Sequence, residues 1–103
     1  MNFDLLDGYL LDGSPAKGEV VQRLLESPAP TPRAAAFYDG MRLLGPRTPD
    51  LSLMALRLVL AGRTADDATV VELRGIVDRA RRGDEAARQA YRDLCGAAQS
   101  EPS

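Results

Sequence analysis

Apolar residues recur every three or four positions along most of this chain, and prolines and glycines divide the pattern into short segments. That period is the period of an amphipathic α-helix. No segment shows the two-residue alternation and the β-branched enrichment that are typical of a strand. The pattern therefore predicts an all-α fold, a compact bundle or orthogonal array of five to six short helices. We expect these helices over residues 3–11, 15–26, 32–44, 49–61, 65–82 and 84–95.

Three of the expected helices follow a hydroxyl residue and a proline, at Ser14-Pro15, Thr31-Pro32 and Thr48-Pro49. A hydroxyl can accept a hydrogen bond from a free amide of the first helical turn, and proline fits the first helical position because it has no amide hydrogen to leave unpaired. Thr64 is expected to cap the fifth helix. Gly62 is expected to end the fourth helix in a left-handed conformation.

The segment from Leu51 to Ala61 is apolar on almost every side and carries one basic residue, Arg57. A helix at the surface would show a polar face, so this segment is predicted to be the central and most buried helix. The apolar run is only about half as long as a membrane span. We therefore expect no association with a membrane.

The length of the chain predicts one domain. A chain of 103 residues suffices for one hydrophobic core. We expect a single helical domain over residues 1–96 and a disordered polar tail over residues 97–103. Aromatic residues make up only 5% of the chain, with no tryptophan, so the core is expected to consist mainly of leucine, valine and alanine.

The composition excludes most catalytic and metal chemistry. The chain has no histidine and one cysteine, Cys95. A Ser-His-Asp or Cys-His arrangement cannot be built from these residues, and a zinc site with one cysteine and carboxylates would be exceptional. Cys95 lies in a last helical turn, where the helix dipole disfavours a thiolate, and is expected to be an apolar packing residue. We therefore predict that the protein is not an enzyme and has no cofactor and no catalytic, cofactor-binding or metal-binding residue.

The N-terminal residues and the charge bear on location and partners. The first residues lack the basic and apolar regions of a signal peptide, and a lone cysteine cannot form an internal disulfide, so the expected location is the cytoplasm. Lys17 is the only lysine among 13 basic residues, a bias that is typical of GC-rich bacterial genomes. The net charge is −2, so the protein is not expected to attract nucleic acid.

Five arginines gather near the C-terminal end of the chain, and two interpretations of them stay open. They could form a face that binds an acidic or phosphorylated ligand. They could instead form a solvated face of ion pairs, because Asp78–Arg82 and Asp84–Arg88 are four residues apart with the acid first, which is the favourable orientation. The sequence favours the second interpretation. The five residues are Arg79, Arg81, Arg82, Arg88 and Arg92.

The run Asp50-Leu51-Ser52-Leu53 at the start of the fourth segment resembles a known motif. It is similar to the Asp-Ser-Leu helix of acyl and peptidyl carrier proteins, in which a serine at the start of the second helix carries phosphopantetheine. The resemblance implies that Ser52 would be the attachment site in a degenerate carrier-like domain. Leu51 separates the acid from the serine, and Pro49 stands where the family has glycine.

These exclusions leave the surface as the place where function is expected. We predict a small, non-catalytic protein–protein interaction module, such as an adaptor, a regulator or a small subunit of a complex. The partner is another protein or a second copy of this chain. The alternative is a DNA-binding regulator, in which residues 32–61 would supply two helices and a turn. The N-terminal segment, which is acidic and aromatic, either docks on a partner or folds back onto its own bundle. The predicted partner-binding residues are Phe3, Leu6, Leu10, Leu53 and Leu60.

Overall fold

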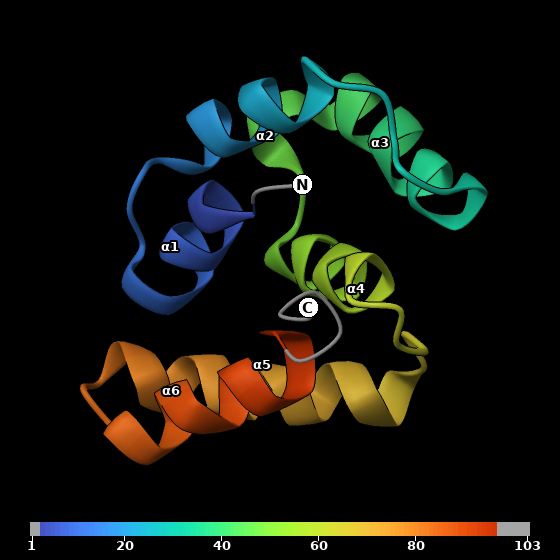
Figure 1. Ribbon diagram of the computed structural model, residues 1–103. Coiled ribbons are helices and arrows are strands. Elements are labelled where there is room, and N and C mark those ends of the chain that lie inside the picture. The colour runs from blue at the N-terminus through green and yellow to red at the C-terminus, as the bar shows by residue number, and fades with distance from the viewer. Residues whose placement is uncertain (1–2, 97–103) are drawn as a thin grey trace, which may run out of the picture.

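The computed structural model describes residues 3–96, and the predicted tail over residues 97–103 lies outside the described residues. Residues 3–96 contain helices and no strand, which confirms the predicted all-α class. Each of the six predicted segments corresponds to an α-helix, and a 3₁₀ turn (η1) and a π-helical turn (η2) are added (Figure 1). The elements are α1 (Asp4–Asp12), α2 (Lys17–Leu25), α3 (Pro32–Leu44), η1 (Gly45–Arg47), α4 (Asp50–Leu60), α5 (Asp67–Arg81), α6 (Glu85–Tyr91) and η2 (Arg92–Gly96).

The helices form three layers (Figure 1). The middle layer holds α1 and α4, with α2 and α3 on one side of it and α5 and α6 on the other. Both middle helices therefore contact both outer layers: α1 packs on α2 and α5, and α4 packs on α3 and α5. The radius of gyration, 12.8 Å, agrees with the roughly 13 Å expected for a compact domain of this length.

The most buried helix is α4, as the sequence predicted. Its Leu53, Leu56 and Leu58 side chains are completely buried, because α4 lies between α3 and α5. Its basic residue, Arg57, is also buried, with only 1% of its surface exposed. Within residues 3–96, no helix combines the length and the apolar character that crossing a bilayer requires.

Two of the predicted helix ends are confirmed. The Thr31 hydroxyl accepts a hydrogen bond of 3.1 Å from the amide of Ala34, and Pro32 occupies the first position of α3. At the end of α4, Gly62 has a φ of 77°, and its amide donates to the carbonyl of Val59. Glycine suits this position because the left-handed conformation crowds the Cβ of other residues.

Two of the predicted helix starts are wrong. Ser14 does not cap α2, and Pro15 is not its first residue. The helix begins at Lys17 and has no side-chain cap. Thr64 does not cap α5. The carboxylate of Asp66 does so instead, accepting a hydrogen bond of 2.9 Å from the amide of Thr69. Aspartate is at least as good a capping residue as threonine, so the start of the helix moves by two residues.

The predicted start at Thr48-Pro49 is also displaced. The Thr48 hydroxyl donates a hydrogen bond of 2.8 Å to the carbonyl of Gly45, which η1 brings close to it. Thr48 is buried in this turn and does not cap α4. Pro49 therefore precedes the helix, and α4 begins at Asp50 without a side-chain cap.

Candidate functional site

The structure places the predicted partner-binding residues in the interior. Phe3, Leu6, Leu10 and Leu53 are buried, and Leu60 is half-buried against the core. The N-terminal segment forms α1 and folds back onto its own bundle, which was the alternative left open by the sequence. These four side chains are at most 7% exposed, so in this structure they pack inside the domain and do not form an exposed surface. The physical reason is that a small domain needs these apolar contacts for its own core.

Helix α1 is attached to the bundle by a buried ion pair. The Nε atom of Arg57 in α4 lies 2.6 Å from Oδ1 of Asp7 in α1, and the Tyr91 hydroxyl of α6 donates to the same oxygen. The ring of Phe3 covers the guanidinium, with its centroid 4.9 Å away. One carboxylate thus joins the N-terminal helix, the central helix and the C-terminal helix.

The buried groups around this ion pair keep their ordinary protonation states. Burial lowers the pKa of Arg57, but the hydrogen bond to Asp7 and its negative charge raise it by more, so the guanidinium stays charged. Burial and the Asp7 charge raise the pKa of Tyr91, so its hydroxyl stays protonated and remains a donor. Burial raises the pKa of the Cys95 thiol to about 11, so this cysteine is a protonated packing residue and no thiolate is present near neutral pH.

A second polar cluster joins α1 to the start of α4. The hydroxyl of Tyr9 and the ammonium of Lys17 both contact Oδ1 of Asp50 at 2.9 Å. Burial acts to raise the pKa of Asp50, but the hydrogen bonds from Lys17 and Tyr9 outweigh it and lower that pKa. Asp50 is therefore ionised and held in one orientation, at the point where α1, α2 and α4 meet.

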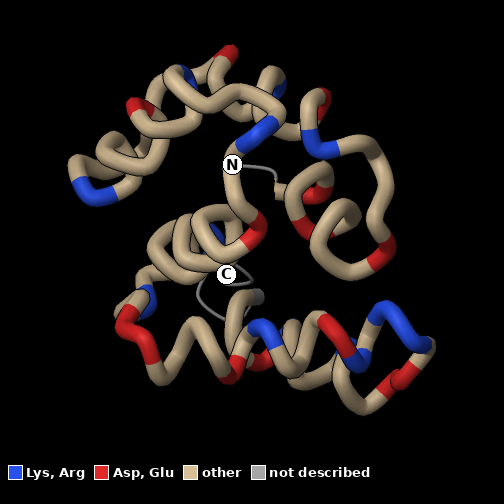
Figure 2. The backbone as a smooth tube through the Cα atoms, turned by 180° about the vertical axis from the view of Figure 1, so that it is seen from behind, with Lys and Arg blue, Asp and Glu red and all other residues tan. Residues whose placement is uncertain are grey.

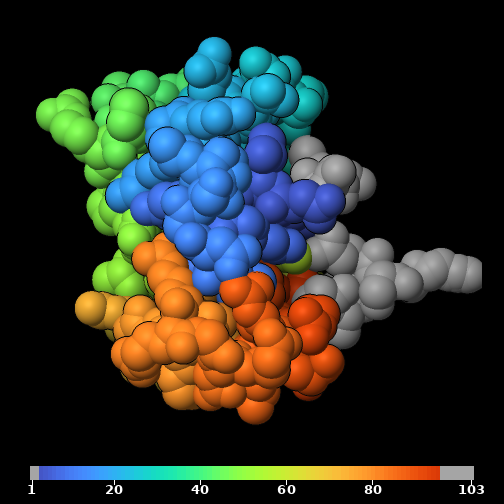
Figure 3. Space-filling model, turned by 90° about the vertical axis from the view of Figure 1, so that its left-hand side faces the viewer, coloured from blue at the N-terminus to red at the C-terminus, as the bar shows by residue number. Residues whose placement is uncertain are grey.

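Two arginines of the predicted basic cluster bind α1. Arg81 donates to the carbonyl oxygens of Leu10 and Tyr9, at 2.7 and 2.9 Å, and lies over the ring of Tyr9. Arg88 forms an ion pair with Asp12. In Figure 3 the blue N-terminal part of the chain lies above the orange α5 and α6, and α1 is the helix of that part that packs on α5. Arg81 stabilises the last turn of α1, where the final carbonyl groups of a helix lack amide partners within it, although the Tyr9 carbonyl also accepts from the amide of Gly13.

The two ion pairs predicted along the basic cluster are wrong. Asp84 does not pair with Arg88, because its carboxylate caps α6 and accepts a hydrogen bond from the amide of Ala86. Within residues 3–96, Asp78 and Arg82 form no ion pair with each other. Both side chains are exposed, where a single pair gains little free energy.

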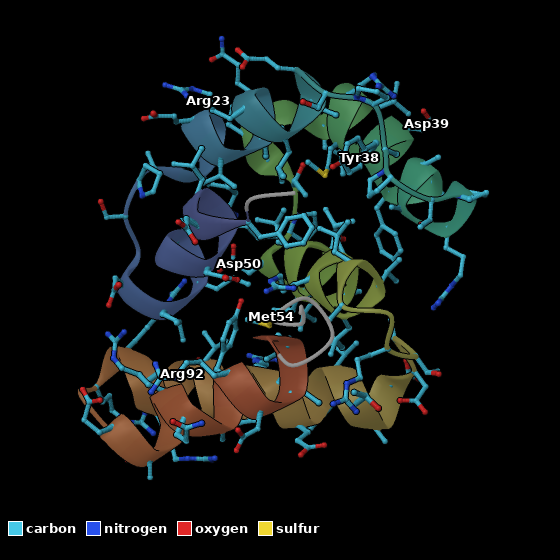
Figure 4. The ribbon with its side chains drawn as sticks, viewed as in Figure 1. Arg23, Tyr38, Asp39, Asp50, Met54 and Arg92 are labelled. Carbon is cyan, nitrogen blue, oxygen red and sulfur yellow. The ribbon has the colours of Figure 1, made fainter. Side chains whose placement is uncertain are left out.

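A groove of about 350 Å³ runs between the first turns of α4 and the outer side of α5. Its floor contains the buried side chain of Met54, and Leu51, which is 44% exposed, stands at its wall. Figure 4 shows Asp50 and Met54 between the middle layer and the α5–α6 layer. We call this feature the α4–α5 groove. It is lined by Pro49, Asp50, Leu51, Met54, Arg74, Asp78 and Arg81.

The charged residues of the groove are of two kinds. Asp50 and Arg81 are held by the contacts to α1 described above. Arg74 and Asp78 are exposed and form no ion pair within residues 3–96. The groove therefore offers an apolar floor, an apolar wall, one guanidinium and one carboxylate to a binding partner.

Four large apolar side chains are exposed within residues 3–96. Leu43 and Leu44 lie at the end of α3, Leu51 lies on α4 and Val71 lies on α5. Val71 is 67% exposed and precedes Arg74 by one helical turn. Val71 was not among the predicted partner-binding residues, although a signal was present in the sequence: it lies outside the helical stripe of α5 that the core buries.

The remaining candidates for chemistry are dispersed. Ser52, the site implied by the resemblance to carrier proteins, is half-buried in the first turn of α4 beside Leu51. In the part of the chain that the structure describes, no three Cys, Asp or Glu side chains gather as a metal site would require. Comparison of the chain with known protein families, with curated proteins and with solved structures found no match.

Proposed function

We propose that this chain is a small, non-catalytic helical module that binds a protein partner in the cytoplasm, and that the partner docks at the α4–α5 groove. One observation carries the proposal. Leu51 and Val71 are exposed at the helices that border the groove, and Met54 provides its apolar floor. A concavity that combines apolar side chains with charged ones is a common form of protein-binding surface.

The non-catalytic part of the proposal rests on how the polar groups are used. Asp7, Arg57 and Tyr91 bind one another and hold α1 in place. Asp50 is neutralised by Lys17. An acid–base pair needs carboxyl groups that differ in environment and can reach a substrate, and these carboxylates are already engaged inside the fold.

The proposed partner segment has a definite chemistry. Its centre would be an aliphatic or aromatic side chain that reaches Met54 past Leu51, since a groove of about 350 Å³ holds only a few side chains. Its flanks would carry an acidic residue for Arg74 and a basic residue for Asp78. A protein fits this surface better than DNA does, because α4, the second helix of the predicted pair, is buried and because Arg81 and Arg88 bind α1.

The exposed leucine of the groove gives the test of this proposal. Capture of partners by the tagged chain, from cells of its native source, is expected to fall at least about tenfold when Leu51 is changed to Glu, because a buried interface centre does not accept an unpaired charge. The matched control is Leu43→Glu, which adds the same charge at an exposed leucine of α3. Both variants should keep the helical far-UV circular dichroism of the parent. Equal capture by both variants would contradict docking at the groove.

A further inference from the structure

The outer face of α5 carries six exposed charges that have no ion-pair partner within residues 3–96. Helix α6 and the middle layer cover the other sides of α5, and both charge signs alternate along this layer when it is seen from behind (Figure 2). We call this outer face the α5 ridge. Its charges are Asp67, Glu72, Arg74, Asp78, Arg79 and Arg82.

The order of these charges is self-complementary. From the first to the last residue of the ridge the signs are negative, negative, positive, negative, positive and positive. If a second copy of the ridge runs in the opposite direction and crosses near Gly75, then Asp67 lies near Arg82 of the other copy. Glu72 then lies near Arg79, and Arg74 near Asp78. A parallel second copy would instead place like charges together.

Gly75 supports a close approach of another helix at the crossing point. It lies in the interior of α5, where glycine destabilises a helix relative to alanine. Nothing within residues 3–96 requires it: a Cβ built there would meet only the flexible end of the Arg79 side chain, at 3.5 Å. A second backbone crossing at this position gives the glycine a physical reason, because two helices approach most closely where a side chain is missing.

Val71 supplies the apolar contact of the ridge. It is 67% exposed and lies one turn from Gly75, so a symmetric crossing near Gly75 would bring the two copies of Val71 toward the interface. Arg74, three residues after Val71, lines the α4–α5 groove together with Leu51. A two-fold axis through the crossing point would use each contact twice, as in most soluble homo-oligomers.

We infer that the occupant of this surface is a second copy of the chain, which packs its α5 antiparallel on α5 of the first. This inference rests on the proposed protein-binding role of the α4–α5 surface and names its partner. The helix is about 22 Å long, so the contact is at the small end of specific interfaces. The dimer is accordingly reversible and depends on its charge pairs.

Charge exchange between the two copies tests this geometry. Sedimentation equilibrium over a wide range of concentration is expected to show a reversible dimer for the unchanged chain. Arg74→Asp and Asp78→Arg should each weaken that dimer by about tenfold or more, since each brings like charges together twice. An equimolar mixture of the two variants should dimerise again. In the mixed dimer, positions 74 and 78 of one copy are both acidic and face positions 78 and 74 of the other copy, which are both basic. Gly75→Leu should prevent dimerisation by obstructing the crossing.

Control variants separate this outcome from misfolding and from a general charge effect. Arg47→Asp makes the same charge change at an exposed residue of η1 and should leave the dimer unchanged. A chain that stays monomeric at every concentration, or a mixture of the two charge variants that does not dimerise, overturns the inference. The Leu51→Glu variant tests the proposed function separately, because its loss of capture does not depend on whether the partner is a second copy.

Discussion

Changing Asp7 to alanine is expected to lower the free energy of unfolding by about 3–5 kcal/mol. The reason is that Arg57 stays behind as a buried charge. Its side chain is 1% exposed, its Nη1 atom has no hydrogen-bond partner within residues 3–96, and Asp7 supplies its ion pair. A domain of this size has a total stability of only about 5–15 kcal/mol, so the loss would bring it close to unfolding. Urea unfolding followed by circular dichroism measures the change.

A double variant distinguishes the loss of the ion pair from simple damage to α1. Asp7→Ala combined with Arg57→Met removes the unpaired charge and fills its place with an apolar side chain of similar length. Buried ion pairs can often be replaced by apolar residues without net loss, so the double variant should be more stable than Asp7→Ala alone. Equal or lower stability of the double variant would show that the buried charge is not the cause.

Shortening Leu56 to alanine is expected to cost about 2–5 kcal/mol, because the side chain is completely buried in the middle of α4. The cost has two parts, the lost burial of apolar surface and the cavity that remains between α3 and α5. The matched control is Leu43→Ala, at a position that is 82% exposed, where a change within about 0.5 kcal/mol is expected. A shift below about 1 kcal/mol for Leu56→Ala would mean that α4 is not the centre of the core.

The helices could be predicted from the sequence because their signals are local. The apolar residues on almost every side of the Leu51–Ala61 segment identified the central helix, and the Thr31-Pro32 pair identified the start of α3. Local signals also compete with one another. Thr48 resembles a capping residue in the sequence, but the turn that precedes α4 uses its hydroxyl for a different hydrogen bond.

The polar contacts that hold α1 could not be predicted because they join distant parts of the chain. Asp7 is 50 residues from Arg57 and 84 residues from Tyr91. A signal for part of the cluster was present: one arginine in a helix that is otherwise apolar must find a buried partner. The sequence does not say which carboxylate that partner is, since this depends on how α1 packs on α4.

The α4–α5 groove could not be predicted from the sequence for a similar reason. A concavity arises from the spacing of two packed helices, and hydrophobic periodicity gives the faces of each helix without their separation. The predicted involvement of the fourth helix in binding named Leu53 and Leu60. It stays a prediction for Leu60, which is half-buried, whereas the side chain of Leu53 is completely buried.

Site-specific photocrosslinking tests most directly the central proposal that this chain binds a protein at the α4–α5 surface. A photoreactive phenylalanine analogue would replace Leu51 or Val71 in turn, and Gln22 on α2 and Leu43 on α3 would serve as exposed comparison positions. The proposal predicts covalent protein adducts in cells of the native source, or between copies of the purified chain, from positions 51 and 71 and not from positions 22 and 43. Adducts that form only from position 43, or from none of the four positions, would contradict it.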